Sequence, residues 1–322
     1  MPDSAPLAAP PAATTDGTAA AARERRIGLA CAFGVLFVWA GFLLAGRLSA
    51  KQAFAPGDVA LLRYAGSFPV CLALAWRFGW PRLSPGRAAA VVATAGLGFP
   101  LLAYMGFGLA PAAHAGVMLP GTLPFLTAAL GAAFAAERWT RRRALSLAVV
   151  ACGIGLLASD TFGAHPGAWR GDLLFLAGSA SWAVYTLLVR LWRVPALDAT
   201  VAVGLGCLPV FLPMWWFALP SNFAAVGWGP ILFHLVWQGV FAAVVAGFLF
   251  TRAVNALGAP TTTTITSLVP AMAALGAWPL LGEPLGAAGL AGVALVSLGM
   301  VLGVARGGAV TAPPLAPRAG RD

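Results

Sequence analysis

The chain has 322 residues, of which 60% are hydrophobic and only 9% are charged. A soluble domain carries roughly 25% charged residues, so this composition excludes an ordinary soluble protein and indicates a polytopic membrane protein. The formal net charge is +10. The basic residues stand in short clusters between apolar runs, which is typical of membrane topology signals and not of a nucleic-acid-binding surface.

The N-terminal end of the sequence is rich in Ala, Pro and Thr, and we predict that residues 1–26 form a disordered cytoplasmic tail. Residues 1–22 contain no basic residue and no apolar core, so they do not resemble a secretory signal. The first apolar run follows Arg23, Arg25 and Arg26 and is too long for a signal sequence. It therefore predicts a retained helix.

About ten apolar segments follow, each near the roughly 20 residues that a helix needs to cross a bilayer. They lie near residues 28–46, 58–76, 88–108, 112–135, 144–159, 172–191, 199–219, 229–251, 259–281 and 286–305. The fifth is short, and only Pro111 separates the third from the fourth, so the count could differ by one. We expect an all-α polytopic membrane protein with ten transmembrane helices, and a second cytoplasmic tail at 306–322.

The second half of the sequence repeats the first. The repeated pairs are Trp39 with Arg47 and Trp182 with Arg190, both eight residues apart, and Pro124 with Glu137 and Pro270 with Glu283, both thirteen apart. We therefore predict two repeats, at 27–160 and 171–305. Because five helices in each repeat is an odd number, the second repeat must be inverted relative to the first. Inverted repeats in an apolar chain are typical of transporters.

The distribution of Lys and Arg predicts the orientation of the chain. With the N-terminus in the cytoplasm, sixteen of the twenty basic residues are cytoplasmic, three are on the opposite side, and Arg63 lies inside a span. The positive-inside rule therefore places both termini in the cytoplasm. We expect the protein itself to lie in the inner or plasma membrane.

Four stretches of the sequence resemble the EamA-type members of the drug/metabolite transporter superfamily. They are Gly-Val-Leu-Phe-Val-Trp-Ala-Gly at 34–41 with Leu-Leu-Arg-Tyr at 61–64, Pro-Gly-Thr-Leu-Pro at 120–124 with Ala-Glu-Arg at 136–138, the stretch 171–185, and Ser-Leu-Val-Pro at 267–270 with Leu-Gly-Glu-Pro at 281–284. Together they cover most of residues 27–305. The first repeat departs from the family pattern at Ala136, where the family prefers Gly.

This resemblance implies a ten-helix secondary transporter that works by alternating access. Its substrate would be a small organic metabolite, such as an amino acid or a related amphipathic compound, with export favoured. The resemblance also implies a substrate cavity near mid-membrane, lined by the first, third and fourth helices and their counterparts in the second repeat.

Ten side chains within the spans are candidate substrate contacts. They are Trp39, Arg63, Tyr104, His114, Trp182, Tyr185, His234, Gln238, Thr262 and Thr266. A Trp at mid-span needs a partner for its N–H, and its ring face can bind an apolar or cationic ligand, although it could equally pack between helices. Tyr185 follows Trp182 by three residues, so the two share a helical face.

Ionisable groups within the spans are rare and have two interpretations each. Arg63 could extend to the outer surface, or it could face the cavity and attract an anionic group. His114 and His234 could carry a proton, which would allow proton coupling, or could be packing residues. All ten Asp and Glu residues fall in tails, loops or helix ends, which argues against a Na⁺ site. Thr262 and Thr266 could contact substrate or bond back to helix carbonyls.

Pro124 and Pro270 lie within predicted spans, where a proline frees a carbonyl and allows either a hinge or a static bend. Glu137 and Glu283 are expected at helix ends as caps or members of ion pairs. The sequence contains no nucleophile and base pair, metal-ligand motif or nucleotide loop, so we expect neither an intramembrane enzyme nor a metal or cofactor. The alternative to metabolite transport is export of a cationic drug, which the aromatic residues favour and the lack of a buried carboxylate disfavours. The expected partners are a small-molecule substrate and the lipid bilayer.

Overall fold

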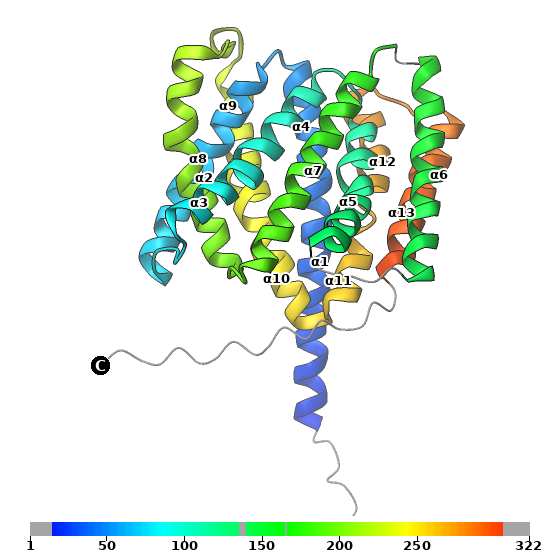
Figure 1. Ribbon diagram of the computed structural model, residues 1–322, viewed down its shortest axis with the longest axis horizontal. Coiled ribbons are helices and arrows are strands. Elements are labelled where there is room, and N and C mark those ends of the chain that lie inside the picture. The colour runs from blue at the N-terminus through cyan, green and yellow to red at the C-terminus, as the bar shows by residue number, and fades with distance from the viewer. Residues whose placement is uncertain (1–14, 135–139, 165, 305–322) are drawn as a thin grey trace, which may run out of the picture.

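The computed structural model describes residues 15–134, 140–164 and 166–304, and every regular element within them is a helix. The helices follow the predicted spans in order (Figure 1). They are α1 (Thr15–Lys51), α2 (Pro56–Phe78), α3 (Pro85–Val91), α4 (Phe99–Phe107), α5 (Ala112–Phe134), α6 (Arg141–Ala164), α7 (Trp169–Leu191), α8 (Ala196–Ala218), α9 (Trp228–His234), α10 (Ala246–Leu257), α11 (Ala259–Thr266), α12 (Val269–Leu281) and α13 (Ala287–Val304). A single 3₁₀ turn, η2 (Phe223–Ala225), lies between α8 and α9.

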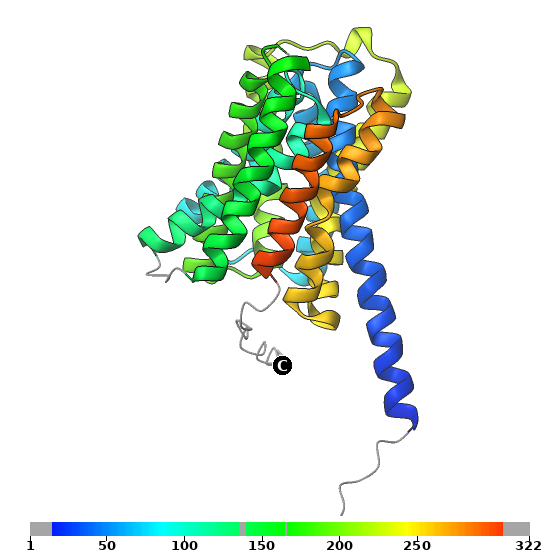
Figure 2. The ribbon, with the colours of Figure 1, turned by 90° about the vertical axis from the view of Figure 1, so that its right-hand side faces the viewer.

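Eight of these helices or joined runs of helices are long and apolar enough to cross a membrane. They are α1, α2, α3 to α4, α5, α7, α8, α9 to α10, and α11 to α12. The fifth and tenth predicted spans coincide with α6 and α13, which pack against each other at one edge of the molecule (Figures 1 and 2). The crossing of the membrane by this last pair stays a prediction.

The N-terminal part of the chain differs from the expectation. Residues 15–26, which composition assigns to a disordered tail, continue α1 as a helix. Glu24 in this extension forms an ion pair with Arg252 near the end of α10, with 2.6 Å between its Oε1 and the Arg252 Nη1. The extension thus contacts the other half of the chain, and sequence composition alone does not reveal this contact.

The helices of each repeat pack against helices of the other repeat. The first helix of each repeat packs on the third and fourth helical segments of the other, since α1 contacts α10 and α12 while α7 contacts α4 and α5. The second helices, α2 and α8, pack on each other. The start of α7 lies beside the end of α1, because Phe107 contacts both ends: its carbonyl accepts from Arg47, and its ring lies 5.2 Å from that of Phe175. These two corresponding helices, α1 and α7, thus run in opposite directions, as an inverted repeat predicts.

The third helical segment of each repeat contains a π-helical section. In the first repeat it is η1 (Val92–Gly98), between α3 and α4, and in the second it is η3 (Leu235–Val245), between α9 and α10. Short π-helical sections interrupt the regular α-helical ladder and are frequent at functional sites. Their occurrence at corresponding places in both repeats marks the region between them as a candidate site.

The two prolines expected at hinges occupy different settings. Pro124 lies inside an unbroken α5, whereas Pro270 lies in the first turn of α12, directly after a break at residues 267–268. A proline in a first turn removes an N–H that has no helical partner in any case. The ninth predicted span is therefore interrupted in the structure, while the fourth is continuous.

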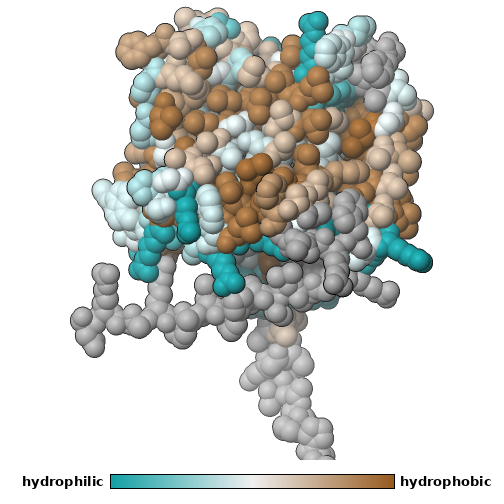
Figure 3. Space-filling model, in the orientation of Figure 1, coloured by the Kyte–Doolittle hydropathy of each residue, from teal (hydrophilic) through white to brown (hydrophobic). Residues whose placement is uncertain are grey.

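The surface supports a membrane location. Hydrophobic residues cover the middle of the face shown in Figure 3, and hydrophilic residues gather toward its two ends. Large apolar side chains such as Phe217 and Trp278 are mostly exposed. The buried aromatic cluster around Phe42, Tyr104 and Phe107 forms the core between α1 and α4.

Candidate functional site

A cavity of about 80 Å³ lies between the two repeats, and we call it the central cavity. Its walls come from α2 and η1 of the first repeat and from α7, α8 and η3 of the second. The residues that line it are Arg63, Tyr64, Ser67, Cys71, Ala95, Gly96, Trp182, Tyr185, Thr200, Val203, Gly204, Cys207, Ala243 and Val244. Both π-helical sections contribute to this wall. The wall includes the third segment of each repeat and the first helix of the second repeat, α7, as the family resemblance implied. It also includes the second helices α2 and α8, which the resemblance did not imply, and no residue of α1, α5, α11 or α12.

Arg63 is the one charged side chain among the residues that line the central cavity. Its guanidinium lies 5.6 Å from the centre of the Phe42 ring, and its Nη1 donates to the carbonyl oxygen of Gln238 at 3.2 Å. Both contacts hold the cation without neutralising it. The structure thus places Arg63 in the cavity wall, one of the two positions that the sequence allows.

Trp182 and Tyr185 form the aromatic part of the cavity wall. Their ring centres are 5.0 Å apart, and the ring of Phe99 at the start of α4 lies 4.9 Å from that of Trp182. Because the two residues are three positions apart on α7, they point to the same side of the helix, as the sequence predicts. Ser181 next to them donates to the carbonyl oxygen of Thr94 at 2.8 Å, which joins α7 to η1.

A second cavity, of about 160 Å³, lies near the end of α1, and we call it the outer cavity because it lies toward one end of the helix bundle. Arg47, Lys51, Phe54 and Tyr104 are among the residues that line it. Tyr104 is 2% exposed, and its hydroxyl has no hydrogen-bond partner in the described part of the chain. Its ring lies 6.2 Å from that of Phe42, which the Arg63 guanidinium also contacts, so Tyr104 and Arg63 pack against one ring.

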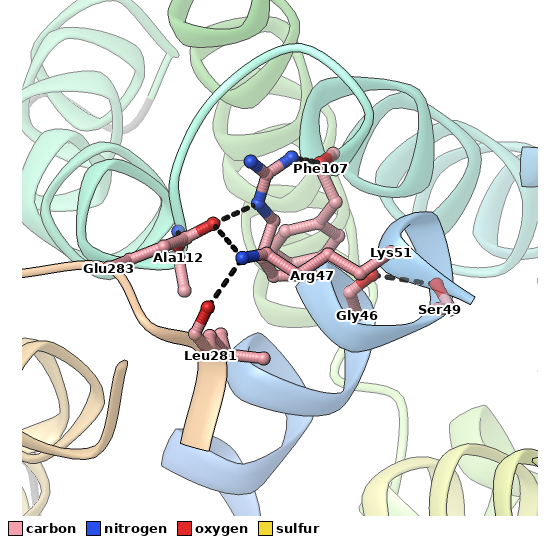
Figure 4. Close-up of polar contacts among 8 residues, drawn as sticks. All are labelled: Gly46, Arg47, Ser49, Lys51, Phe107, Ala112, Leu281 and Glu283. Atoms are coloured by element: carbon pink, nitrogen blue, oxygen red, sulfur yellow. Dashed lines mark hydrogen bonds and ion pairs between the residues drawn. The ribbon is translucent and has the colours of Figure 1, made fainter. Parts of the chain in front are cut away.

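A polar network that includes Arg47 and Lys51 lies beside the outer cavity at the end of α1 (Figure 4). Oε1 of Glu283 lies 2.6 Å from Nε of Arg47 and 3.3 Å from Nζ of Lys51, and its Oε2 accepts from the backbone N–H of Ala112 at 3.1 Å. Arg47 also donates to the carbonyl oxygen of Phe107 at 2.6 Å. One carboxylate thus ties together the end of α1, the start of α5 and the segment between α12 and α13.

The backbone conformation of Gly282 places Glu283 in this network. Gly282 ends α12 with a left-handed backbone, φ 65°, which glycine adopts without steric cost. The next residue then turns back toward α1. The expectation of an ion pair at Glu283 is correct in kind, although its partners come from another helix and not from the adjacent sequence. Glu137, its counterpart in the first repeat, lies outside the described residues.

Other candidate residues are held by protein partners. Trp39 stacks on Phe250 of α10, with 5.5 Å between ring centres, and does not line either cavity. His114 is buried, and its Nδ1 lies 3.0 Å from Oδ1 of Asp172 at the start of α7. These contacts place Trp39 and His114 between helices, and a substrate contact for either stays a prediction.

The remaining candidates lie on α9, η3 and α11. Nε2 of His234 lies 3.0 Å from Oε1 of Gln52, and Gln238 uses its backbone oxygen for Arg63. Thr262 and Thr266 donate to the carbonyl oxygens of Gly258 and Thr263, three or four residues earlier. Back-bonding of this kind is common for threonine in membrane helices. Among the ten candidates, the central cavity therefore gathers Arg63, Trp182 and Tyr185.

Sequence reasoning missed three features of the site. Neither π-helical section was expected, nor were the wall residues Ser67 and Thr200. Arg47 was noted as half of a repeated pair and not as the partner of Glu283, which the structure shows it to be. Within the described ranges, no group of three His, Cys, Asp or Glu residues is arranged to hold a metal ion.

A helical membrane protein whose two repeats enclose one central cavity is of the transporter class. The sequence profile of the EamA-like transporter family matches residues 26–159 and 169–304, and the chain belongs to this family. The two matched ranges correspond to the two predicted repeats.

Comparison with solved structures supports the fold. A structure described only as "Crystal structure of protein" is 20% identical, has a TM-score of 0.59, and matches over 87% of this chain and 96% of its own. At this identity the likeness concerns the fold alone. No curated protein matches the chain.

Proposed function

We propose that this chain is a secondary transporter that moves a small organic metabolite, an amino acid or a related amphipathic compound, by alternating access. The observation that carries the proposal is the central cavity, because both repeats and both π-helical sections contribute to it. A cation at one part of the wall and two aromatic rings at another suit an amphipathic ligand. Family membership supports a transport role for this cavity.

The dimensions of the cavity favour a cycle with at least two conformations. Its volume of about 80 Å³ is well below the roughly 300–1,000 Å³ typical of ligand pockets, so the repeats must move apart to admit a metabolite. The network around Glu283 supplies polar contacts that can form in one conformation and break in another. With the N-terminus in the cytoplasm, this network would close the outer side, and we propose export from the family resemblance.

Flux across sealed vesicles tests this function. Proteoliposomes loaded with a metabolite panel should show protein-dependent counterflow of at least one labelled compound. Replacing Trp182 by Leu keeps an apolar side chain and removes the ring face, so we expect transport to fall about 3- to 10-fold at unchanged expression. The matched control is Trp216→Leu, since Trp216 is 70% exposed on the surface of α8 and does not line the cavity.

Two results would contradict the proposal. The first is that no compound of the panel shows protein-dependent flux, although the protein is folded in the vesicles. The second is equal transport by the Trp182→Leu and Trp216→Leu variants, which would place the substrate away from the central cavity.

A further inference from the structure

We infer that the substrate carries a carboxylate that binds Arg63 and an apolar body that lies against Trp182 and Tyr185. This inference rests on the proposed transport function and specifies the substrate class of the same cavity. It follows from the charge of the cavity wall, from the unused donors around Arg63, and from the position of the aromatic rings.

The first argument is the charge of the wall. Arg63 faces the central cavity, and no described carboxylate lies within ion-pair distance of it. The five carboxylates whose side chains are described have partners elsewhere: Glu24 with Arg252, Asp58 with Trp215 and the N–H of Asn222, Asp172 with His114, Asp198 with the N–H of Arg82, and Glu283 with Arg47 and Lys51. The described wall of the cavity therefore carries one uncompensated positive charge.

An uncompensated cation inside a membrane protein is energetically costly and commonly marks a functional site. The Phe42 ring and the Gln238 carbonyl lower this cost, but both are neutral and cannot replace a counter-ion. A substrate carboxylate supplies that counter-ion. The same field repels a cationic substrate, which argues against export of a cationic drug through this cavity.

Unused hydrogen-bond donors are the second argument. A guanidinium has five N–H donors in a planar fork that matches a carboxylate, and the structure shows one hydrogen bond from that of Arg63. The buried Tyr104 hydroxyl has no hydrogen-bond partner in the described part of the chain. Its ring and the Arg63 guanidinium both contact Phe42. The Arg63 guanidinium and the Tyr104 hydroxyl thus both have donors to spare beside the same Phe42 ring, and a carboxylate can accept from them.

The third argument is the distribution of polar and apolar wall. Hydroxyls near Arg63 are already engaged, since Tyr64 donates to the Gly96 carbonyl at 2.7 Å and Ser67 donates to the Tyr64 carbonyl at 3.2 Å. The part of the wall formed by Trp182 and Tyr185 offers ring faces, which suit an apolar or aromatic group. A compound with one carboxylate and one apolar body satisfies both parts.

Three probes that share one apolar body test this inference. They are 3-phenylpropionate, 3-phenylpropanamide and 3-phenylpropylamine, which are anionic, neutral and cationic at pH 7. Each is offered as a labelled counterflow substrate to proteoliposomes of the full chain, beside the metabolite panel of the flux experiment. We expect 3-phenylpropionate and the carboxylates of the panel to exchange, with half-maximal concentrations about 10- to 100-fold lower than those of the amide and the amine.

Variants of Arg63 give a second measurement. Arg63→Gln should raise the half-maximal concentration of 3-phenylpropionate about 10- to 100-fold and that of the amide much less, because a neutral amide oxygen accepts weaker hydrogen bonds than a carboxylate. Arg63→Lys keeps the charge but not the fork, so its value should lie in between. The matched control is Arg170→Gln, because Arg170 is exposed at the start of α7 over the Trp169 ring and does not line the cavity.

The possible results distinguish failure of the inferred substrate class from failure of the proposed transport function. Exchange of the amine or of other cations in preference to carboxylates would overturn the inference and leave the transport function standing. Equal affinity of wild type and Arg63→Gln for 3-phenylpropionate would do the same. The comparison of the three probes on the wild-type protein needs no variant, so it still tests the inference if Arg63→Gln fails to fold. No flux of any probe or panel compound would overturn the transport function itself.

Discussion

Two ion pairs in this protein have the same chemistry and different surroundings. Glu283 is 9% exposed and faces Arg47, whereas Glu24 is 50% exposed and faces Arg252. An exposed pair contributes little, because water screens it and both side chains lose rotamer entropy. Removing one partner of a buried pair costs more, because the other charge stays desolvated. The network at Glu283 is therefore the stronger of the two links between the halves of the chain.

Replacing Glu283 by Gln should lower the stability of the purified protein by about 2–3 kcal/mol, since Arg47 and Lys51 then lose their counter-ion. The matched substitution Glu24→Gln should cost much less, because water screens this exposed pair. Thermal unfolding of both variants in the same detergent measures the difference. Equal melting temperatures for the two variants would show that the Glu283 network adds no stability to this conformation.

The site residues show how far sequence reasoning reaches. One cavity is lined by Arg63, Trp182 and Tyr185. Such polar side chains are rare within apolar spans, because burying them is costly unless they share a cavity or a partner, so their meeting could be expected from the sequence. Trp39, the repeat counterpart of Trp182, packs on Phe250 instead. A repeated motif fixes the helix on which a residue lies, but the packing of that helix decides what its side chain contacts.

Among the elements, the contact between α2 and η3 positions the cavity wall. Gly66 of α2 and Gly239 of η3 face each other without side chains, and a Cβ at Gly239 would lie 2.7 Å from the Cα of Gly66 and 2.9 Å from the carbonyl oxygen of Arg63. Backbone atoms at such distances cannot move aside as a flexible side chain can. This close approach holds the Arg63 segment of α2 against η3.

Replacing Gly239 by Ala should therefore destabilise the protein by about 1–3 kcal/mol, because the added methyl group forces α2 and η3 apart. The control is Gly247→Ala in α10, where a Cβ would meet nothing within 4 Å. That substitution should stabilise by up to about 1 kcal/mol, since Ala has the higher helix propensity. Thermal unfolding of both variants gives the comparison. A Gly239→Ala variant as stable as Gly247→Ala would contradict the close contact.

The element boundaries were largely predictable, and the interruptions within elements were not. The predicted spans 58–76 and 199–219 coincide with α2 and α8, because span length follows from the thickness of the bilayer. The sections η1 and η3 have the same apolar composition as an α-helix and differ in hydrogen bonding alone. That difference depends on packing between the repeats, which no local sequence pattern contains.

At the scale of the whole molecule, the basic residues divide between the two ends of the helix bundle. Arg141, Arg142 and Arg143 begin α6, and Arg190 lies in the last turn of α7. The start of α7 carries Arg170, and the end of α1 carries Arg47 and Lys51. Figures 1 and 2 show that the start of α1 extends from the end of the bundle opposite to the Glu283 network. The positive-inside rule then predicts that this extension is cytoplasmic.

Cysteine labelling of intact cells tests the orientation. In a background without Cys31, Cys71, Cys152 and Cys207, a membrane-impermeant thiol reagent should label Trp169→Cys and leave Arg141→Cys unlabelled until the cells are opened. Both positions are exposed, at the starts of α7 and α6, so their exposure in the fold does not distinguish them. A difference in labelling therefore reports the side of the membrane on which each position lies. Labelling of Arg141→Cys in intact cells, with Trp169→Cys protected, would reverse the orientation, place the Glu283 network on the cytoplasmic side and remove the basis for calling it an outer closure.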